Sequence, residues 1–361
     1  DESAQVNSID FLYLPSEIHR MDGNFMHSKV KDKDGFGLTA GYGYTPSKNF
    51  YSGIGIKYYD DRFDLNDMGY LILNDRLMFN GRTQFKRTTF REGSVLRSRL
   101  FEIGYGSKFN VDSERESSNF ALKLENNFVN LSEIKAEVFY RSTGRNTRIT
   151  RGSKFAPFIK MPKGMGGYID FTGPRRPTYV YGLRFERGRG SEHSPELGWG
   201  TKSRGYLKYM PTDTLSFSLT YQHQRENEWL NWYGDNLLAT FQRKQRTSIV
   251  EMEWFRNNIH ELRIKAQMVA FTGREPQSFL GDLSGNLNPE DIYIPPITIS
   301  ELAFQVRYRY EIMPLSYLYL VYSKGGRISL QDEEDDLFSL YRRPWNSPEK
   351  ENFTVKLRYR F

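Results

Sequence analysis

Apolar and polar residues alternate along most of this chain with a period of two. The pattern is clearest in the C-terminal segment, where two sets of side chains interleave: Phe353, Val355, Leu357, Tyr359 and Phe361 against Thr354, Lys356, Arg358 and Arg360. Successive side chains of a β-strand point to opposite faces. The segment is therefore predicted to be a strand with one apolar face and one basic face.

The same alternation recurs upstream, at residues 36–44, 53–58, 134–141, 215–222, 262–268 and 304–311. Short connections at 45–49, 130–132, 211–213, 256–259 and 313–315 alternate with long polar ones at 142–166, 188–203, 225–236, 272–298 and 325–351. This alternation is typical of bacterial outer-membrane barrels, whose periplasmic turns are short and external loops long. We therefore predict an all-β fold, a transmembrane up-and-down antiparallel β-barrel of about 16 strands, an even number as in single-chain bacterial barrels.

The order of short and long connections also predicts strand direction. The strand at residues 36–44 is expected to run towards the periplasm, so one outward-running strand must precede it, near residues 8–14. Residues 1–34 are expected to form an N-terminal segment that holds this first strand and a partial plug. Residues 35–361 are expected to form the barrel as one domain, since roughly ten spanning residues per strand plus the loops use up the chain.

Composition excludes one membrane class and leaves two soluble alternatives. No run of about 20 apolar residues is present, which excludes a bundle of membrane-spanning helices. The mean hydropathy of -0.66 resembles that of a soluble protein, but a barrel with a polar lumen places lipid-facing residues at every second position only. The 24 Tyr and 26 Phe fit aromatic girdles at two membrane interfaces. A soluble propeller is disfavoured because no fixed repeat of roughly 20 to 50 residues is visible, and a compact sandwich because its loops are rarely this long.

Charge, cysteine content and the start of the chain add little. The net charge of +7 comes from 51 basic and 44 acidic residues, which is compatible with an anionic environment or ligand. The absence of cysteine fits an oxidising compartment without disulfides, and also fits the cytosol. No signal peptide is recognisable, and the first five residues resemble a mature or trimmed start, as expected for one domain of a longer precursor.

Three segments resemble an uncharacterised bacterial family. They are Asn66-Asp67-Met68-Gly69-Tyr70-Leu71, the stretch at 317–326 and the C-terminal Leu357-Arg358-Tyr359-Arg360-Phe361. The terminal aromatic is also similar to the last strand of outer-membrane barrels. In that family, a periplasmic module similar to family 9 carbohydrate-binding modules precedes a C-terminal outer-membrane barrel, and some members are described as membrane-associated hydrolases. The resemblance implies the barrel from about residue 35 onward and supplies no catalytic residues. The module is missing from this chain, either because it was removed or because the match is to the barrel alone.

Basic residues on the predicted lumen face are the first candidate site. They come from three strands near the end of the chain: Arg263, Lys265, Arg307, Arg309, Lys356, Arg358 and Arg360. Such a wall would attract anionic solutes or acidic glycans, because guanidinium groups bind carboxylates and phosphates in bidentate fashion. The alternative is that these cations pair with lumen carboxylates such as Glu251, Glu253, Glu311, Glu125 and Glu137, and stiffen the barrel.

Two further groups have a functional and a structural interpretation each. Gly41, Gly43, Gly53 and Gly55 lie on one face of two neighbouring strands, where they either admit another backbone, such as the plug, or allow strong curvature. A predicted external loop holds Trp229, Trp232 and Tyr233 beside Asp235, an arrangement that suits a sugar ligand. Aromatic residues at a strand end also serve as interface anchors.

Evidence for metal binding or catalysis is sparse in the sequence. The acidic run at 332–336 has oxygen ligands suited to Ca²⁺ but no EF-hand spacing, so a solvated loop is the alternative. His223 follows Ser216 and Ser218 on a predicted lumen face, which would permit a Ser–His pair, but a structural role is the alternative. No Gly-x-Ser-x-Gly, His-x-x-x-His or phosphate-loop motif is present. We predict no cofactor and no resident metal.

The sequence leaves three functions open for a protein of the bacterial outer membrane. The first is a channel, or a translocation or anchoring barrel, linked to glycan handling through the missing module. The second is an outer-membrane hydrolase, and the third is a structural barrel without an open pore. The expected partners are outer-membrane lipid and lipopolysaccharide, a glycan or anionic solute, and a periplasmic or secreted protein. Nucleic acid is not expected as a partner.

Overall fold

The computed structural model describes residues 4–66, 74–151, 153–189, 197–257, 259–332 and 336–360. Most of the Asn-Asp-Met-Gly-Tyr-Leu motif at 66–71, the middle of the acidic run at 332–336 and the terminal Phe361 lie outside the described residues. The described part is almost entirely β-structure, with one helix, α1 (Leu337–Asn346). None of its helices is both long and apolar enough to cross a membrane.

Eighteen strands form one sheet, and a small separate hairpin, β9 (Gly144–Asn146) with β10 (Ile159–Met161), makes a second. The first eight strands are β1 (Ala4–Ser16), β2 (His19–Val30), β3 (Lys33–Ser47), β4 (Phe50–Tyr59), β5 (Arg76–Arg87), β6 (Leu96–Phe109), β7 (Arg115–Phe128) and β8 (Glu133–Arg141). The others are β11 (Gly164–Thr172), β12 (Tyr179–Arg189), β13 (Trp199–Thr212), β14 (Leu215–Gly234), β15 (Leu237–Arg256), β16 (His260–Gly281), β17 (Leu287–Glu290), β18 (Ile297–Met313), β19 (Ser316–Leu330) and β20 (Lys350–Arg358).

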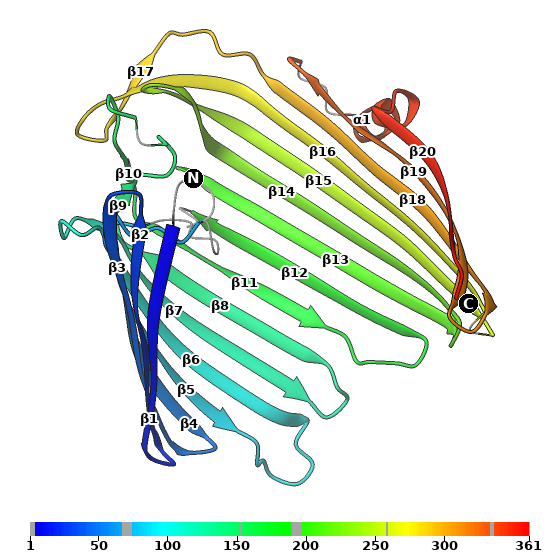
Figure 1. Cartoon of the computed structure of the whole chain (residues 1–361), viewed down its shortest axis with the longest axis horizontal. Helices are drawn as coiled ribbons and strands as arrows, with labels where there is room; N and C mark the ends of the chain where they lie inside the picture. Colours follow the sequence, from blue (N-terminus) through cyan, green and yellow to red (C-terminus); the bar gives the residue numbers. More distant parts are fainter. Residues whose placement is uncertain are drawn as a thin grey trace. The chain divides into compact units, whose positions relative to one another are not determined.

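The strands follow one another as an antiparallel up-and-down sheet, as the sequence predicts. Figure 1 shows β2 to β7 side by side in blue to cyan, and β12 to β16 with β18 and β19 side by side in green to orange. The strand β17 has four residues and pairs with the end of β16. The prediction of about sixteen strands is therefore slightly low, because the N-terminal segment holds β2 in addition to the predicted strand, and the 272–298 connection holds β17.

The N-terminal segment forms two strands, so the predicted plug is wrong for its described residues. Residues 8–14 do lie in a strand, β1, but β2 follows it and pairs with both β1 and β3. The short sequence Lys31-Asp32 turns the chain between β2 and β3, with Lys31 at a φ of 56°. The first strand, β1, pairs with β2, and the last strand, β20, pairs with β19.

One face of the sheet carries apolar side chains and the other carries polar ones, as two neighbouring rows of paired residues show. One row across β14, β15, β16 and β18 is apolar and consists of Leu219, Val250, Ala266 and Phe304. The neighbouring row on the other face is polar and consists of Ser218, Glu251, Lys265 and Gln305. The apolar side chains lie at the surface, with 49% of Leu219 and 45% of Val250 exposed. We call these the apolar and the polar face of the sheet.

The chain forms two compact units, and each has a small core of its own. In the first unit, Phe63 is fully buried against Gly35 and Gly37 of β3. An added Cβ at Gly35 would lie 2.4 Å from the Phe63 backbone, so only glycine admits this close approach. In the second unit, a buried cluster forms near the start of β15 and consists of Ala239, Phe241 and Ile294.

Several predicted loops are shorter in the structure because strands extend into them. The connection predicted at 225–236 is a two-residue turn at Asp235 and Asn236, since β14 and β15 continue to Gly234 and from Leu237. The connection predicted at 272–298 begins only after Gly281. The 325–351 connection contains the end of β19 and helix α1. The Asp336 side chain caps this helix by accepting a hydrogen bond from the Ser339 N–H over 2.7 Å.

Candidate functional site

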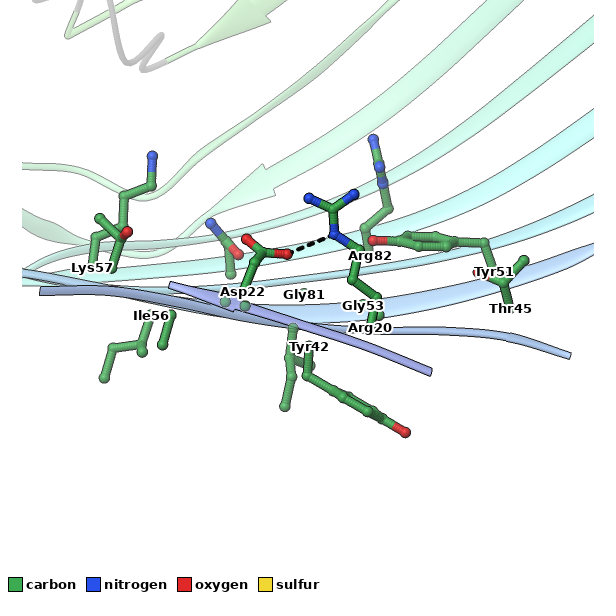
Figure 2. Close-up of a pocket in the computed structure, with 17 residues that line it drawn as sticks. Arg20, Asp22, Tyr42, Thr45, Tyr51, Gly53, Ile56, Lys57, Gly81 and Arg82 are labelled. Atoms are coloured by element: carbon green, nitrogen blue, oxygen red, sulfur yellow. Dashed lines mark hydrogen bonds and ion pairs between the residues drawn. The ribbon is translucent and has the colours of Figure 1, made fainter. Parts of the chain in front are cut away.

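A cavity of about 700 Å³ lies on the polar face of the first unit, over β2, β3, β4 and β5. Its charged and aromatic side chains are Arg20, Asp22, Tyr51, Lys57 and Arg82. In Figure 2 these side chains project from one side of the strands, while Tyr42 and Ile56 project from the other. Strand alternation explains this arrangement, because the residues on each strand are separated by even numbers of positions.

Four glycines form the floor of this cavity. Gly41, Gly43, Gly53 and Gly55 all line it, so they share one face as predicted. An added Cβ at Gly43 would lie 3.5 Å from Tyr51, in ordinary van der Waals contact with its ring. At Gly53 an added Cβ would lie 2.3 Å from the Tyr51 hydroxyl. The glycines therefore leave room above the strands and let Tyr51 lie flat across them.

The cavity carries three cations and one carboxylate. The Arg20 Nε donates to the Asp22 carboxylate over 2.9 Å, and both side chains remain about half exposed. The Arg82 guanidinium lies 5.2 Å from the centre of the Tyr51 ring, within cation–π range. Lys57 projects from β4 on the same face. With Asp22 offset by Arg20, the local charge is positive.

This arrangement suits an anion that rests against the strands. Guanidinium groups offer paired N–H donors to carboxylates or phosphates, and the glycine floor admits a flat ligand between them. The described residues contain no group of three or more His, Asp or Glu placed to hold a metal ion. The charged side chains that line the site are groups suited to binding an anion.

Three of the seven basic residues predicted on the lumen face, which we call the basic wall, line one cavity in the second unit. Arg263, Lys265 and Arg307 line a cavity of about 370 Å³ on its polar face, together with Lys208, which the sequence analysis did not select. Glu251 and Glu253 line the same cavity. Four cations and two carboxylates therefore line this cavity, which gives its side chains the same net positive charge as those of the cavity in the first unit.

Salt bridges connect most of this wall to carboxylates. The Lys265 Nζ lies 2.7 Å from Glu251, and the Arg263 Nε lies 3.8 Å from Glu253 and also contacts Glu261. Arg309 lies 2.9 Å from Glu261. The Arg307 guanidinium donates to the Gln305 amide oxygen over 3.3 Å. The pairing that the sequence left as an alternative is therefore present for Arg263 and Lys265, while Arg309 pairs with a carboxylate that the sequence analysis did not select.

The three predicted cations of the last segment do not line this cavity. Lys356 and Arg358 lie on β20, opposite Tyr319 and Tyr317 of β19. Arg360 follows the strand, and its backbone N–H donates to the Ser316 hydroxyl over 3.0 Å. Their role in ligand binding stays a prediction.

The aromatic group at 229–235 is not an exposed loop, because β14 runs through it. Trp229 packs against Phe241 and Phe271, with ring centres 5.9 and 5.4 Å apart, and joins the buried cluster of the second unit. The Trp232 Nε1 donates to the backbone oxygen of Asp235 over 3.1 Å, which closes the turn. Burial raises the pKa of the Tyr233 phenol. These contacts give Trp229 a packing role. Sugar binding by the group stays a prediction.

The Ser–His pair considered for catalysis is wrong for geometric reasons. The ladder between β14 and β15 has no irregularity from Leu215 to Glu226, so residues of odd and even number lie on opposite faces. Ser218 lies on the polar face and donates to Glu251 over 3.1 Å. His223 lies on the apolar face, opposite Arg246.

Sequence reasoning found the glycine floor but missed the charges above it. The four charged residues lie on the same face as the glycines. Arg20, Asp22 and Arg82 lie directly opposite glycines of the neighbouring strand, and Lys57 lies two residues after Gly55 on β4. A search for cations on the glycine face of neighbouring strands would have found this site. Its Arg20 and Asp22 were missed because only residues 8–14 of the N-terminal segment were predicted as a strand, so β2 was not recognised.

The model of the family "Domain of unknown function (DUF5916)" matches residues 4–361. The chain belongs to this family. The match agrees with the predicted resemblance to an uncharacterised family, and it includes no module similar to family 9 carbohydrate-binding modules. No curated protein matches the sequence.

Solved structures of outer-membrane proteins resemble this DUF5916 chain at low identity. The siderophore receptor PirA from Pseudomonas aeruginosa has 8% identity and a TM-score of 0.47, over 91% of this chain and 70% of the receptor. PirA from Acinetobacter baumannii has 9% identity and a TM-score of 0.45, over 99% and 70%. OmpT, an outer membrane protein of Vibrio cholerae, has 10% identity and a TM-score of 0.31 in its trimer form, over 98% and 95%.

Proposed function

We propose that this chain is an integral outer-membrane β-barrel whose polar face binds or guides anionic solutes. The apolar face supports the membrane assignment. Large apolar side chains are more than half exposed on strands of both units, among them Ile54 at 65%, Leu183 at 62% and Val355 at 58%. A soluble protein rarely exposes an apolar surface that continues from strand to strand, whereas a lipid-facing sheet requires one.

Two identical aromatic clusters support a membrane boundary at the end of the short turns. In the first unit His19, the first residue of β2, stacks on Tyr44 at 5.1 Å, and its Nδ1 lies 2.7 Å from the Tyr42 hydroxyl. In the second unit His260, the first residue of β16, stacks on Tyr310 at 5.1 Å, and its Nδ1 lies 2.7 Å from the Tyr308 hydroxyl. Tyrosines with an apolar ring and a polar tip concentrate where lipid meets water.

The glycine-floored cavity of the first unit supports the choice of anions. It combines Arg20, Lys57 and Arg82 with a single carboxylate, over four glycines on two neighbouring strands. This excess of positive charge next to open backbone is the observation that carries the proposal. In the second cavity, Glu251 and Glu253 form salt bridges with Lys265 and Arg263, which supports a rigid wall there and a weaker attraction for anions.

Binding of a small dicarboxylate tests this proposal. Titration of the detergent-solubilised protein with succinate is expected to give a Kd that rises about tenfold in Arg82→Gln, because hydrogen bonds to charged groups contribute about 1.5–3 kcal/mol. Arg82→Lys keeps the charge and is expected to lose less. Gly43→Leu fills the cavity and is expected to abolish binding. Equal affinity in all four proteins would contradict the proposed site.

A further inference from the structure

Two rows of paired residues cross the glycine-floored cavity of the first unit, and their ends carry different polar groups. One row runs across β2, β3, β4 and β5 and consists of Arg20, Gly43, Gly53 and Arg82. The next row on the same face consists of Asp22, Gly41, Gly55 and Asn80. We call these the arginine row and the acceptor row. Each row therefore holds two paired glycines between two polar side chains.

The side chains at both ends of the acceptor row reach over its glycines. Asp22 Oδ2 lies 3.4 Å from the position of a Cβ added at Gly41, and Asn80 Oδ1 lies 2.7 Å from that of a Cβ added at Gly55. Asp22 belongs to β2 and Asn80 to β5, so the two oxygens reach over the floor from opposite sides. Carboxylate and amide oxygens accept hydrogen bonds. The acceptor row therefore suits a ligand that carries donors.

The arginine row carries donors instead. The Arg20 Nε donates to Asp22 Oδ1 over 2.9 Å, which engages a single N–H of a guanidinium group that has several. The Arg82 guanidinium lies 5.2 Å from the centre of the Tyr51 ring, and the Tyr51 hydroxyl lies over Gly53, between the two arginines. Figure 2 shows Arg20, Tyr51 and Arg82 on one side of the strands. Guanidinium donors bind a carboxylate through charge-assisted hydrogen bonds.

Asp22 makes this cavity selective among anions. Neighbouring rows on one face of a sheet lie about 6.6 Å apart, the length of two residues along a strand. The charge of Asp22 therefore repels an anion at the arginine row. A ligand with hydroxyl groups above the acceptor row adds hydrogen bonds that offset this repulsion, because a hydroxyl donates to a carboxylate or amide oxygen. These hydroxyl groups must lie roughly 6–7 Å from the anionic group, the spacing of the two rows.

The net charge of the cavity favours hydroxyl groups over an ammonium group as these donors. The side chains of Arg20, Lys57 and Arg82 line the cavity with the single carboxylate of Asp22. The excess positive charge attracts an anion and repels an ammonium group. The ligand that fits both rows is therefore an anion with neutral donors.

We propose that the glycine-floored cavity binds carboxylates that carry several hydroxyl groups, as sugar acids do. The carboxylate lies at the arginine row, and the hydroxyl groups lie above the acceptor row, where they donate to Asp22 and Asn80. This inference rests on the proposed function, since the cavity must bind anions. It adds the class of anion and the two residues that select it.

Paired titrations test the inference. Gluconate and hexanoate have equal chain lengths and a carboxylate each, and only gluconate carries hydroxyl groups. Calorimetric titration of the detergent-solubilised protein is expected to show gluconate binding about tenfold more tightly, because a hydrogen bond to a charged group is worth at least about that factor. The amine ε-aminocaproate is expected to bind more weakly than gluconate, because the cavity repels its ammonium group.

The variant Asp22→Asn separates selection by this carboxylate from a merely structural role. It is expected to bring the two affinities within about threefold of each other, because hexanoate is no longer repelled and neutral hydrogen bonds are weaker than charged ones. Hexanoate should therefore bind this variant more tightly than it binds the native protein. Loss of both affinities by the same factor would overturn the assignment of Asp22.

An asparagine further along the acceptor row supplies the matched control. Asn80 lies opposite Gly106 of β6, which lies opposite Asn119 of β7. Asn80→Ala is expected to weaken gluconate binding about fivefold, as for the loss of a neutral hydrogen bond, and to leave hexanoate binding unchanged. Asn119→Ala is expected to change neither. Equal effects of the two variants on gluconate would overturn the role of Asn80.

The same titrations distinguish failure of the inference from failure of the proposed function. Equal affinity of the native protein for gluconate and hexanoate would overturn the inference and leave the anion site standing. Tighter binding of ε-aminocaproate than of gluconate would overturn the choice of hydroxyl donors. Binding of none of these ligands, nor of succinate, would overturn the proposed function itself.

Discussion

Arginine at position 355 is expected to prevent most of the protein from inserting into lipid bilayers. Val355 lies on the apolar face of β20, opposite Leu320 of β19, and 58% of it is exposed. A charge that faces hydrocarbon costs about 2–4 kcal/mol near the bilayer midplane, which is a large part of the free energy of unfolding of an ordinary domain. Folding into vesicles, followed by urea titration, measures the loss.

The adjacent position supplies the control. Thr354 lies opposite Val321 on the polar face, so Thr354→Arg adds the same charge to the same strand without facing lipid. Its effect on the free energy of unfolding is expected to stay below about 1 kcal/mol, as for most surface substitutions. If Thr354→Arg is as damaging as Val355→Arg, or more so, the two faces have been assigned the wrong way round.

Neutralising the glycine-floored cavity is expected to change ion selectivity. If the barrel conducts, the native protein in a planar bilayer should prefer anions, because fixed positive charge raises the local concentration of counter-ions. The variant Arg20→Gln, Lys57→Gln, Arg82→Gln removes three charges while it keeps the glycine floor. Its reversal potential in a salt gradient is expected to move clearly towards that of cations.

A charge-preserving variant, Arg20→Lys with Arg82→Lys, is the control and should keep the native reversal potential. Unchanged selectivity in the neutral variant would show that the cavity does not lie on the conduction path. A protein that is silent in bilayers, with and without these substitutions, would contradict an open channel and would favour an anchoring or structural barrel.

The sequence predicts the strands well because apolar and polar side chains alternate along them, as expected when one face contacts lipid and the other contacts water. The turns at 45–49, 130–132, 256–259 and 313–315 were located because the alternation of apolar and polar residues breaks between two strands there. The end of the hairpin of β14 and β15 was predicted as a loop, because the alternation of apolar and polar residues does not continue through Trp229 and its neighbours. Residues there pack on Phe241 and Ile294, and such contacts have no period in the sequence.

The candidate sites were harder to predict, since each depends on strand register. Alternation assigns a residue to a face but does not show which residue lies opposite it. The pairing of Lys265 with Glu251 follows from the register alone. The cavity over Gly43 and Gly53 further required β2 to be recognised as a strand, because it contributes Arg20 and Asp22.

Alternating lipid contact along β4 tests the central claim most directly. Single cysteines at Ile54 and Ile56 on the apolar face, and at Gly43 of β3 and Lys57 of β4 on the polar face, are labelled with a fluorophore in reconstituted protein. Nitroxide-labelled lipids are expected to quench the labels at positions 54 and 56 and to spare those at 43 and 57, while aqueous iodide gives the opposite pattern. Equal quenching of all four labels by iodide, with none by lipid, would contradict a membrane-spanning barrel.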